Sequence, residues 1–404
     1  MRKKWRNGAL LMVVAASSAF PAGLGLDSLI GMGLTPNAEL LAAGQQAETF
    51  ALDTLIGLAP ANPSLALEAM HNVSAPSKPK ASVKLSQEFR PGYRNHVYQS
   101  AKARVSAEKE WQRARELDLI HDIRSSFFEW QFLNQKADLQ REVERRWDAL
   151  SRLAAAKMAE GKISQVDEAQ TRLNLAKARQ KELEIRTGMI DLEKQLGFLS
   201  GAMPLPDSIR PEPMDSIPAM PPMDSLVAWA ERLNPDVKTL QKEIEFSKAQ
   251  ISVEQNLKNP SFNLSLGYER ETDGGNLIGG GVELPLPLFN RNQAAIGKAR
   301  SSLREAELKK NAAEVKARAD LSELYAKLTS LAVRYRNYQA EIRELSRKQL
   351  DLSDKGFRQG LLGVFELSRV QEEALNQDMD ALDVLAEYFR FWNRLGRTVG
   401  GKTW

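Results

Sequence analysis

Cysteine is absent from this chain of 404 residues, and histidine occurs three times. Without cysteine there can be no disulfide framework, no thiolate metal site and no lipid attached to an N-terminal cysteine. A Gly-rich phosphate loop, a nucleophile elbow and a zinc signature are missing too. The net charge of +4, with acids and bases interleaved, argues against a nucleic-acid partner. These absences predict a protein that is not an enzyme and has no cofactor.

Two short motifs place a histidine three residues after an acid, as in a di-metal carboxylate site. They are Glu68–His71 and Asp118–His121. The first lies on a predicted strand, where residues three apart point to opposite faces. A di-metal site would also need two further glutamate-bearing helices. We therefore predict no metal ligand and no catalytic residue.

Long apolar runs are scarce as well. The run over residues 9–16 follows a cluster of Arg and Lys, and it is far shorter than the roughly 20 residues of a membrane-spanning helix. Small residues come next, so residues 1–19 are predicted to be a secretory signal peptide. A membrane anchor is the alternative. No other stretch could span a membrane as a helix.

Alternation with a period of two marks residues 259–288 as a β-hairpin. In both of its runs, apolar residues alternate with small or polar residues and prolines, and a Gly-rich tip separates the runs. An extended segment of this kind has one apolar face and one polar face. The apolar residues that we expect to face outward, toward lipid, are Phe262, Leu264, Leu266, Val282, Leu284 and Leu286.

The chain repeats itself at a separation of roughly two hundred residues, which indicates a doubled supersecondary unit. Asn62, Pro63 and Ser64 precede a first predicted strand as Asn259, Pro260 and Ser261 precede a later one. The predicted domains are a signal peptide (1–19), a first repeat (20–202) with a β-hairpin at 62–89 and a helical-hairpin turn near residue 161, a proline-rich linker (203–222), and a second repeat (223–404) with a β-hairpin at 259–288 and a turn near residue 360.

Long helices are predicted around these hairpins. Residues 24–61 and 223–258 each indicate one helix, and residues 93–160 contain no glycine or proline, enough for a helix of about 100 Å. Two long helices that meet at Gly161 form an antiparallel hairpin, and spacings of three and four indicate a coiled-coil seam. The seam residues are Val166, Ala169, Leu173, Ala176, Gln180, Leu183, Thr187 and Ile190.

Four strands from one chain cannot close a barrel, and unpaired strand edges in lipid cost several kcal/mol per group. If the strands span a membrane, several chains must contribute to one barrel. The alternative is a soluble β-hairpin packed on helices, in a periplasmic coiled-coil scaffold protein.

Two strand-to-helix junctions, at 86–104 and 283–300, resemble the TolC-like outer-membrane factor family, as do the turns AEGKISQVDEAQ and RQGLLGVFELSR. Within this family, the segment PLPLFNRNQ is most similar to the branch that serves heavy-metal cation efflux pumps. The resemblance implies a mainly α protein with membrane β-structure: a homotrimer whose strands form a twelve-stranded barrel in outer-membrane lipid, continued by a helical tunnel into the periplasm.

In function, the resemblance implies the exit duct of a tripartite efflux pump. Its partners would be a periplasmic adaptor (membrane fusion) protein and an inner-membrane resistance-nodulation-division transporter, and its cargo metal cations. A duct for drug efflux or type I secretion is the alternative cargo class.

The resemblance also implies roles for the two helix-hairpin turns as the periplasmic tip. Asp167 and Glu366 take the position of a gate acid, with Arg369 where some family members have a second acid. The alternative interpretation is structural: acids in the first turn of a helix are favoured by the helix dipole. The residues implied to dock the adaptor are Gly161, Lys162, Ile163, Ser164, Gly360, Leu361, Leu362 and Gly363.

Overall fold

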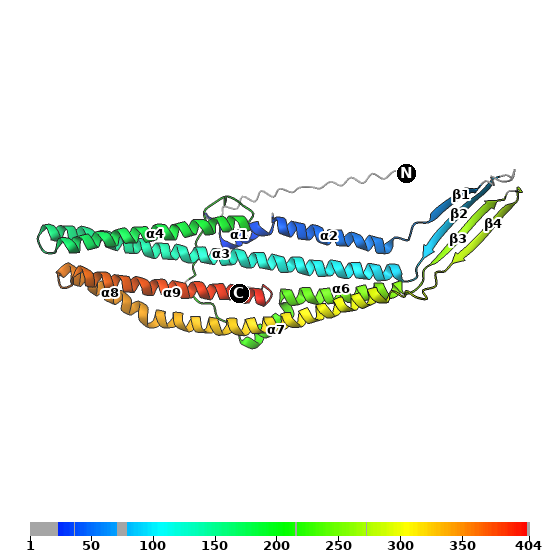
Figure 1. Cartoon of the computed structure of the whole chain (residues 1–404). Helices are drawn as coiled ribbons and strands as arrows, with labels where there is room; N and C mark the ends of the chain where they lie inside the picture. The colour runs from blue at the N-terminus through cyan, green and yellow to red at the C-terminus, as the bar shows by residue number, and fades with distance from the viewer. Residues whose placement is uncertain (1–22, 36, 71–78, 215, 272, 402–404) are drawn as a thin grey trace.

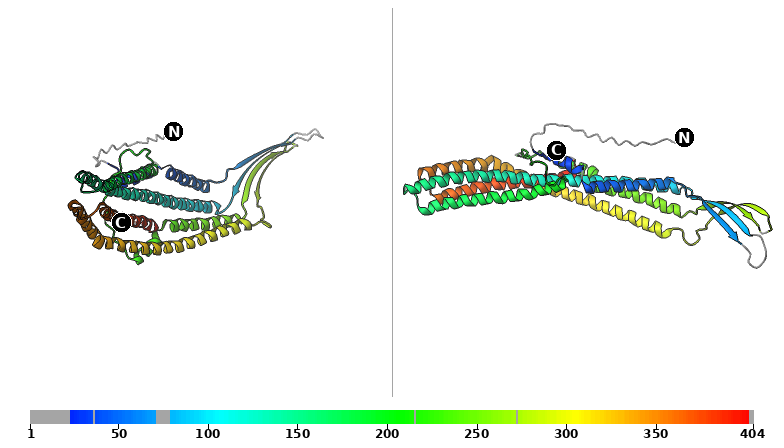
Figure 2. Two further views of the ribbon diagram at one scale, coloured as in Figure 1. Left: turned by 60° about the vertical axis from the view of Figure 1, so that its left-hand side comes forward. Right: turned by 90° about the horizontal axis from the view of Figure 1, so that it is seen from above.

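The computed structural model describes residues 23–35, 37–70, 79–214, 216–271 and 273–401. The predicted signal peptide and His71 lie outside these ranges. The described chain is a long rod of helices with a β-sheet at one end (Figure 1). Figure 2 shows that the sheet leans away from the long axis of the helices.

Both halves of the chain have helices before and after a pair of strands. The first half forms α1 (Leu26–Leu34), α2 (Ala38–Leu58), β1 (Ser64–Met70), β2 (Lys80–Phe89), α3 (Tyr93–Ala159) and α4 (Gln165–Leu199). The second half forms α5 (Met223–Leu233), α6 (Pro235–Leu257), β3 (Phe262–Arg270), β4 (Asn276–Glu283), α7 (Gln293–Asn337), the π-helix η1 (Tyr338–Ile342), α8 (Arg343–Gln359) and α9 (Val364–Thr398).

The long helices lie side by side along the rod. α2 and α4 form one long edge of the molecule, α3 and then α6 with α9 lie inside, and α7 with α8 forms the opposite edge (Figure 1). α3 is unbroken over 67 residues, as the absence of glycine and proline predicted. Each of the two edges packs against the inner helices on one side.

The helices predicted over 24–61 and 223–258 are each broken in two, so the prediction of single helices was wrong. An asparagine begins the second piece each time. The side chain of Asn37 accepts hydrogen bonds from the backbone N–H groups of Glu39 and Leu40, at 3.0 and 3.1 Å. Asn234 does the same at the start of α6, and Pro235 follows it at the first helical position. Asparagine caps and an N1 proline both favour a helix start over a continuing helix.

The coiled-coil seam predicted on α4 does not face α3. The buried side of α4 presents small or polar residues such as Thr171 and Ala178, followed by Ile185. All eight seam residues are exposed, and the larger ones are 48–77% exposed. The spacing correctly predicted an apolar stripe on α4, but the prediction that this stripe packs against α3 was wrong.

The described strands form one antiparallel sheet in the order β1-β2-β3-β4. Its register places one set of apolar side chains on a single face, because partners across a ladder share a face. Phe89 and Phe262 are such partners, and their rings stack with centroids 5.5 Å apart. The main apolar residues of this face are Leu65, Leu67, Val83, Leu85, Phe89, Phe262, Leu264, Leu266, Tyr268, Ile278 and Val282.

The last strand differs from the prediction at both ends. β4 covers Asn276–Glu283, so the glycines at 279–281 belong to the strand, and Leu284 and Leu286 lie beyond it. Val282 remains in the strand, opposite Leu264. Pro285 and Pro287 explain the early end, because proline has no N–H to donate to a ladder.

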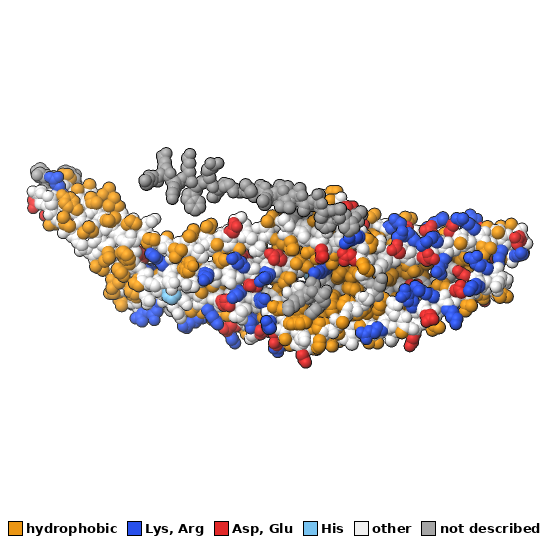
Figure 3. All heavy atoms as spheres, turned by 180° about the vertical axis from the view of Figure 1, so that it is seen from behind, with side chains coloured by type: hydrophobic (Ala, Val, Ile, Leu, Met, Phe, Trp, Pro, Cys, Tyr) orange, Lys and Arg blue, Asp and Glu red, His pale blue; other side chains and the backbone are white. Residues whose placement is uncertain are grey.

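In the described ranges, three apolar clusters pack the helices against one another. The largest joins α5, α7 and α9 with Phe132 of α3, and it includes Tyr388 and Trp392, whose rings stack at 6.0 Å. A second lies around Phe127 and Trp130, where the linker residue Ile209 is buried. In the described part of the chain, no helix combines the length and apolarity that crossing a membrane requires. Figure 3 shows hydrophobic side chains gathered over the sheet and charged ones spread along the helices.

Candidate functional site at the helical tip

Each helical hairpin turns at a glycine with a left-handed backbone. Gly161 has φ 73° and Gly360 has φ 80°, a region that glycine enters without steric cost. In each turn a backbone N–H reaches back across the end of the helix: Lys162 donates to the carbonyl of Lys157, and Leu361 to that of Gly356, both at 2.8 Å. Both turns are therefore αL helix ends that close with the same hydrogen bond.

The two predicted gate acids cap the helices that follow these turns. The Asp167 carboxylate accepts a hydrogen bond from the N–H of Ser164 (3.3 Å), and the Ser164 hydroxyl oxygen accepts one from the N–H of Asp167 (3.1 Å). This reciprocal pair is a capping box. Glu366 accepts from the N–H of Gly363 at 3.0 Å. Gly363 has no side chain, so its turn has half of the box.

Both carboxylates thus have a structural role at a helix start, where the helix dipole also favours negative charge. Glu366 remains exposed, and Asp167 is half-buried. Arg369 lies one turn further along α9 and pairs with Glu373 at 3.5 Å. The role of these three side chains as a gate stays a prediction.

The predicted docking residues form the exposed end of the rod. Leu361 is 76% exposed, and Phe365 beside it is 80% exposed. Leu362 is half-buried against Gly356, where a Cβ would lie 2.9 Å from the leucine side chain. On the other turn the Lys162 ammonium lies 2.7 Å from the Glu160 carboxylate. This hydrogen bond raises the pKa of Lys162 and lowers that of Glu160.

A contact between the two turns was missed by the sequence analysis. The ammonium of Lys157 donates to the backbone carbonyls of Phe357 (2.8 Å) and Arg358 (3.2 Å), and it lies 5.1 Å from the centre of the Phe357 ring. Phe357 is 2% exposed, in a cluster with Trp147 and Leu367. The two tips of one chain are therefore locked side by side by a charge-assisted hydrogen bond and a buried ring.

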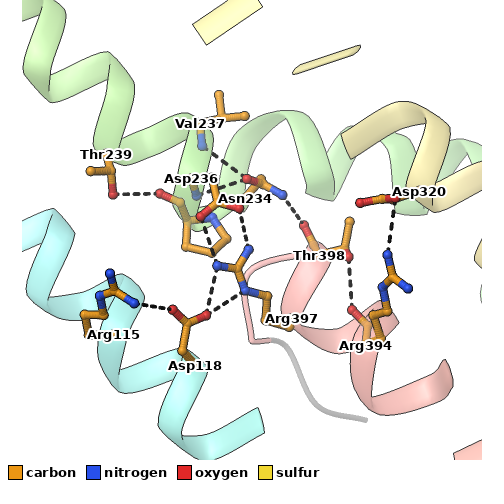
Figure 4. Close-up of polar contacts among 11 residues, drawn as sticks. Arg115, Asp118, Asn234, Asp236, Val237, Thr239, Asp320, Arg394, Arg397 and Thr398 are labelled. Carbon is orange, nitrogen blue, oxygen red and sulfur yellow. Dashed lines mark hydrogen bonds and ion pairs between the residues drawn. The ribbon is translucent and has the colours of Figure 1, made fainter. Parts of the chain in front are cut away.

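A second polar site ties the end of α9 to the start of α6 and to α3 (Figure 4). The Arg397 guanidinium forms a two-pronged ion pair with Asp236 at 2.6 and 2.9 Å, and it also contacts Asp118 at 2.9 Å. Nearby, the Asn234 side chain donates to the carbonyl of Thr398 at 3.0 Å. α9 and α6 are joined end to end by these bonds, which fixes the inner row of the rod.

The charges at this junction shift the ionisation of its members. Hydrogen bonding to Arg397 lowers the pKa of Asp236, and the same bond raises the pKa of Arg397. A depressed carboxyl pKa stabilises the fold at any pH above the ordinary carboxyl value, and this stabilisation is lost as the pH falls through the folded-state pKa.

We expect Arg397→Met to lower the free energy of unfolding by about 2 kcal/mol at neutral pH. Removing Arg397 leaves the Asp236 carboxylate without its ion-pair partner and leaves Asp118 with the longer contact to Arg115 at 3.7 Å. The typical 3–5 kcal/mol for a buried pair is reduced here because the carboxylates are partly exposed. The loss should shrink in acid as Asp236 becomes protonated. Denaturant titration in detergent at several pH values measures it. Arg394→Met removes a more exposed arginine whose single ion pair, with Asp320, is longer (3.4 Å), and it should cost below about 1 kcal/mol. Equal losses in the two variants would contradict the assignment.

The histidine motifs hold no candidate metal site in the described chain. Asp118 is engaged by Arg397, and burial lowers the pKa of the neighbouring His121. No group of three or more His, Cys, Asp or Glu side chains in the described ranges is arranged to bind a metal ion.

The described chain is a rod of paired helical hairpins that ends in a sheet with one apolar face. The chain belongs to the outer membrane efflux protein family, whose model matches residues 29–202 and 226–401. Its members are transport ducts, so the protein is an outer-membrane transport protein and not an enzyme.

Three comparisons give the extent of the similarity. Over 155 residues, 38% of this chain, it is 30% identical to the cobalt-zinc-cadmium resistance protein CzcC of Cupriavidus metallidurans, and the match spans 36% of that relative. The fold matches a membrane protein from Pseudomonas aeruginosa with a TM-score of 0.76 and 17% identity, over 93% of this chain and 90% of that one. It matches the Campylobacter jejuni CmeC outer membrane channel with a TM-score of 0.75 and 16% identity, over 93% and 85% of the two chains.

Proposed function

We propose that three copies of this chain form the exit duct of a tripartite efflux pump, which conducts metal cations passively from a periplasmic adaptor and an inner-membrane transporter to the exterior. The observation that carries the proposal is that both long edges of the described chain expose groups that need a partner. These groups are the free edges of the sheet and large apolar side chains on the helices. An edge that exposes ladder groups or large apolar side chains needs a partner. The two edges are different surfaces, so copies must associate head to tail, and a ring closes such an interface.

The sheet supplies the first part of this argument. β1 and β4 are the outer strands of the described sheet. In lipid their free N–H and C=O groups must be satisfied, because each unsatisfied group costs several kcal/mol. Pairing β4 of one copy with β1 of the next satisfies both edges. The family resemblance supports three copies, and the apolar face of the closed barrel would then face lipid.

The helices supply the second part. On the α4 edge the row formed by Leu173, Leu183 and Ile190 is 48–62% exposed. On the opposite edge Leu345 and Leu352 of α8 are 67% and 58% exposed. Both rows run along the same half of the rod, from the middle toward the tip. Packing one row on the other in successive copies would remove both from water, as the hydrophobic effect favours.

Cation cargo is supported by the similarity to a cobalt-zinc-cadmium resistance protein. Among the described residues no metal-binding cluster is present, so a duct of this kind would take its specificity from the transporter. Deleting the gene should reduce growth in cobalt, zinc or cadmium salts and leave growth with drugs and the secretion of proteins unchanged. If the deletion strain were sensitive to drugs alone, the cargo would be drugs. If the strain failed to secrete a protein, the cargo would be type I secretion substrates.

The proposed gate gives a test in planar bilayers. A narrow ring of carboxylates attracts cations, so Asp167→Asn with Glu366→Gln should lower the cation-over-anion permeability ratio severalfold and weaken block by divalent cations. The amides keep an acceptor oxygen for the helix caps. Arg369→Ala should raise the ratio if Arg369 lines the same ring.

The control for the gate is Glu305→Gln, which removes an exposed carboxylate on α7 far from the tip. It should leave the permeability ratio unchanged. An unchanged ratio in all the tip variants would place these residues on the outer surface, where they would contact the adaptor.

A further inference from the structure

Helix α2 has its large apolar residues on the outside. The buried residues of α2 are mostly small: Ala43, Ala47 and Gly57 are buried together with one large residue, Leu40, near the start of the helix. At Gly57 the helices are so close that a Cβ would lie 2.7 Å from the backbone nitrogen of Tyr98. The outward residues near the C-terminal end of α2 are Leu52, Leu55, Ile56 and Leu58, which are 55–68% exposed. Among the described residues, the outward leucine and isoleucine side chains of this helix have no partner that buries them, as their exposure shows.

A second unpartnered apolar segment lies at the opposite edge of the molecule. The connection from β4 to α7, residues 284–289, follows the end of the sheet. Its apolar members are Leu284, Leu286, Leu288 and Phe289, which are 51%, 68%, 64% and 93% exposed.

This connection has a defined shape despite its exposure. The N–H of Leu288 donates to the carbonyl of Leu286 at 2.8 Å, and the Arg291 guanidinium donates to the carbonyl of Pro287 at 3.2 Å. At its base the Asn292 side chain donates to the backbone carbonyl and the carboxylate of Glu254, at 2.9 and 2.7 Å. The loop is therefore anchored to α6 while Phe289 points away from its own chain.

The corresponding connection in the first half of the chain is different. There β2 continues to Phe89, and Pro91 and Gly92 turn the chain directly into α3. That junction lies in the middle of the molecule, because α3 lies between α2 and α6 (Figure 1). The chain thus places an exposed apolar loop at the edge junction and a compact turn at the inner one.

Both unpartnered surfaces lie at the base of the sheet. Ser64, Ser86, Ser265 and Gly281 form one row across the strands. α2 ends a few residues before Ser64, and the loop begins a few residues after Gly281. The two surfaces therefore flank the sheet at a similar level on opposite edges.

Their charges are complementary as well. The charged residues of α2 are all acidic: Glu39, Glu48 and Asp53. Beside the loop, Arg291 and the first turns of α7 carry basic residues, with Lys298 and Arg300 exposed. Acidic side chains on one partner and basic side chains on the other favour a fixed register between them.

We propose that residues 284–289 of each copy dock on the outward face of α2 of the next copy, with Phe289 packed against Leu52, Leu55 and Ile56. The occupant is thus a second copy of this chain, and the proposal rests on the head-to-tail ring of the proposed function. The contact is a latch at the junction of barrel and tunnel, where the sheet bends away from the rod.

The absence of cysteine makes a cross-linking test clean. In the variant Phe289→Cys with Ile56→Cys, oxidation in membranes should produce covalent dimers and trimers on a non-reducing gel. Each single variant should remain monomeric on that gel. The matched control pairs Phe289→Cys with Leu41→Cys, which is also exposed on α2 but lies about 22 Å from Ile56 along the helix axis; it should not cross-link.

The mass of the detergent-extracted protein separates the possible failures. Absence of the Phe289–Ile56 cross-link in a complex of three chains would overturn the latch and leave the duct standing. In that case a fluorophore on Phe289→Cys that is quenched by spin-labelled lipid would identify the membrane as the occupant. A protein extracted as single chains would overturn the ring itself and the latch with it.

Discussion

Leu264→Arg is expected to abolish assembly in the outer membrane. Leu264 lies on the apolar face of β3, opposite Val282 and Gln87 in the ladders, and is 43% exposed. Arginine on the lipid face near the bilayer midplane costs about 2–4 kcal/mol, and a ring of three chains would incur that cost three times. The trimer band should disappear from purified outer membranes.

The control for this variant is the adjacent residue on the other face of the strand. Asn263 pairs with Glu88 and Glu283, so Asn263→Arg would place its charge beside two carboxylates in the proposed lumen. Assembly of this variant should be near normal. Normal assembly of Leu264→Arg would contradict the assignment of the apolar face to lipid.

Leu183→Arg with Ile190→Arg is expected to separate the copies without unfolding them. These α4 residues are 62% and 51% exposed in one chain, so their replacement leaves the fold of that chain intact. Full burial of a leucine or isoleucine contributes about 1.5–3 kcal/mol, so each of the interfaces would lose several kcal/mol. Native gels should show single chains, while circular dichroism retains the helical signal.

Lys181→Gln provides the control on the same helix. Lys181 is exposed on the flank of α4 and pairs with Glu184 at 3.1 Å, a contact of small value at the surface. The trimer should survive this change. A trimer that also survives the double arginine variant would show that the α4 row faces something other than a second copy.

Local signals in the sequence predicted much of this fold. The freedom from glycine and proline predicted the long helix α3, and Gly161 and Gly360 marked the two turns because each has a backbone that glycine enters most easily. Period-two alternation located three of the strands. The end of β4 was missed because Leu284 and Leu286 continue the apolar alternation although the prolines between them cannot donate to a ladder.

Contacts between distant segments could not be predicted. Lys157 contacts Phe357 across 200 residues of chain, and Arg397 contacts Asp118 across 279. Among 56 basic and 52 acidic residues, no spacing rule selects these partners. The seam on α4 was misassigned for a related reason: a pattern reports that a face is apolar, and the proposed neighbour of that face belongs to another chain.

The mass of the complex extracted from outer membranes tests the central claim most directly. Native mass spectrometry of the wild-type protein, released from detergent, should give the mass of three mature chains with no monomer of comparable abundance. The same protein should form ion-conducting channels in a planar bilayer. A single chain, recovered from the periplasm without detergent, would contradict the account and leave a coiled-coil scaffold as the better description.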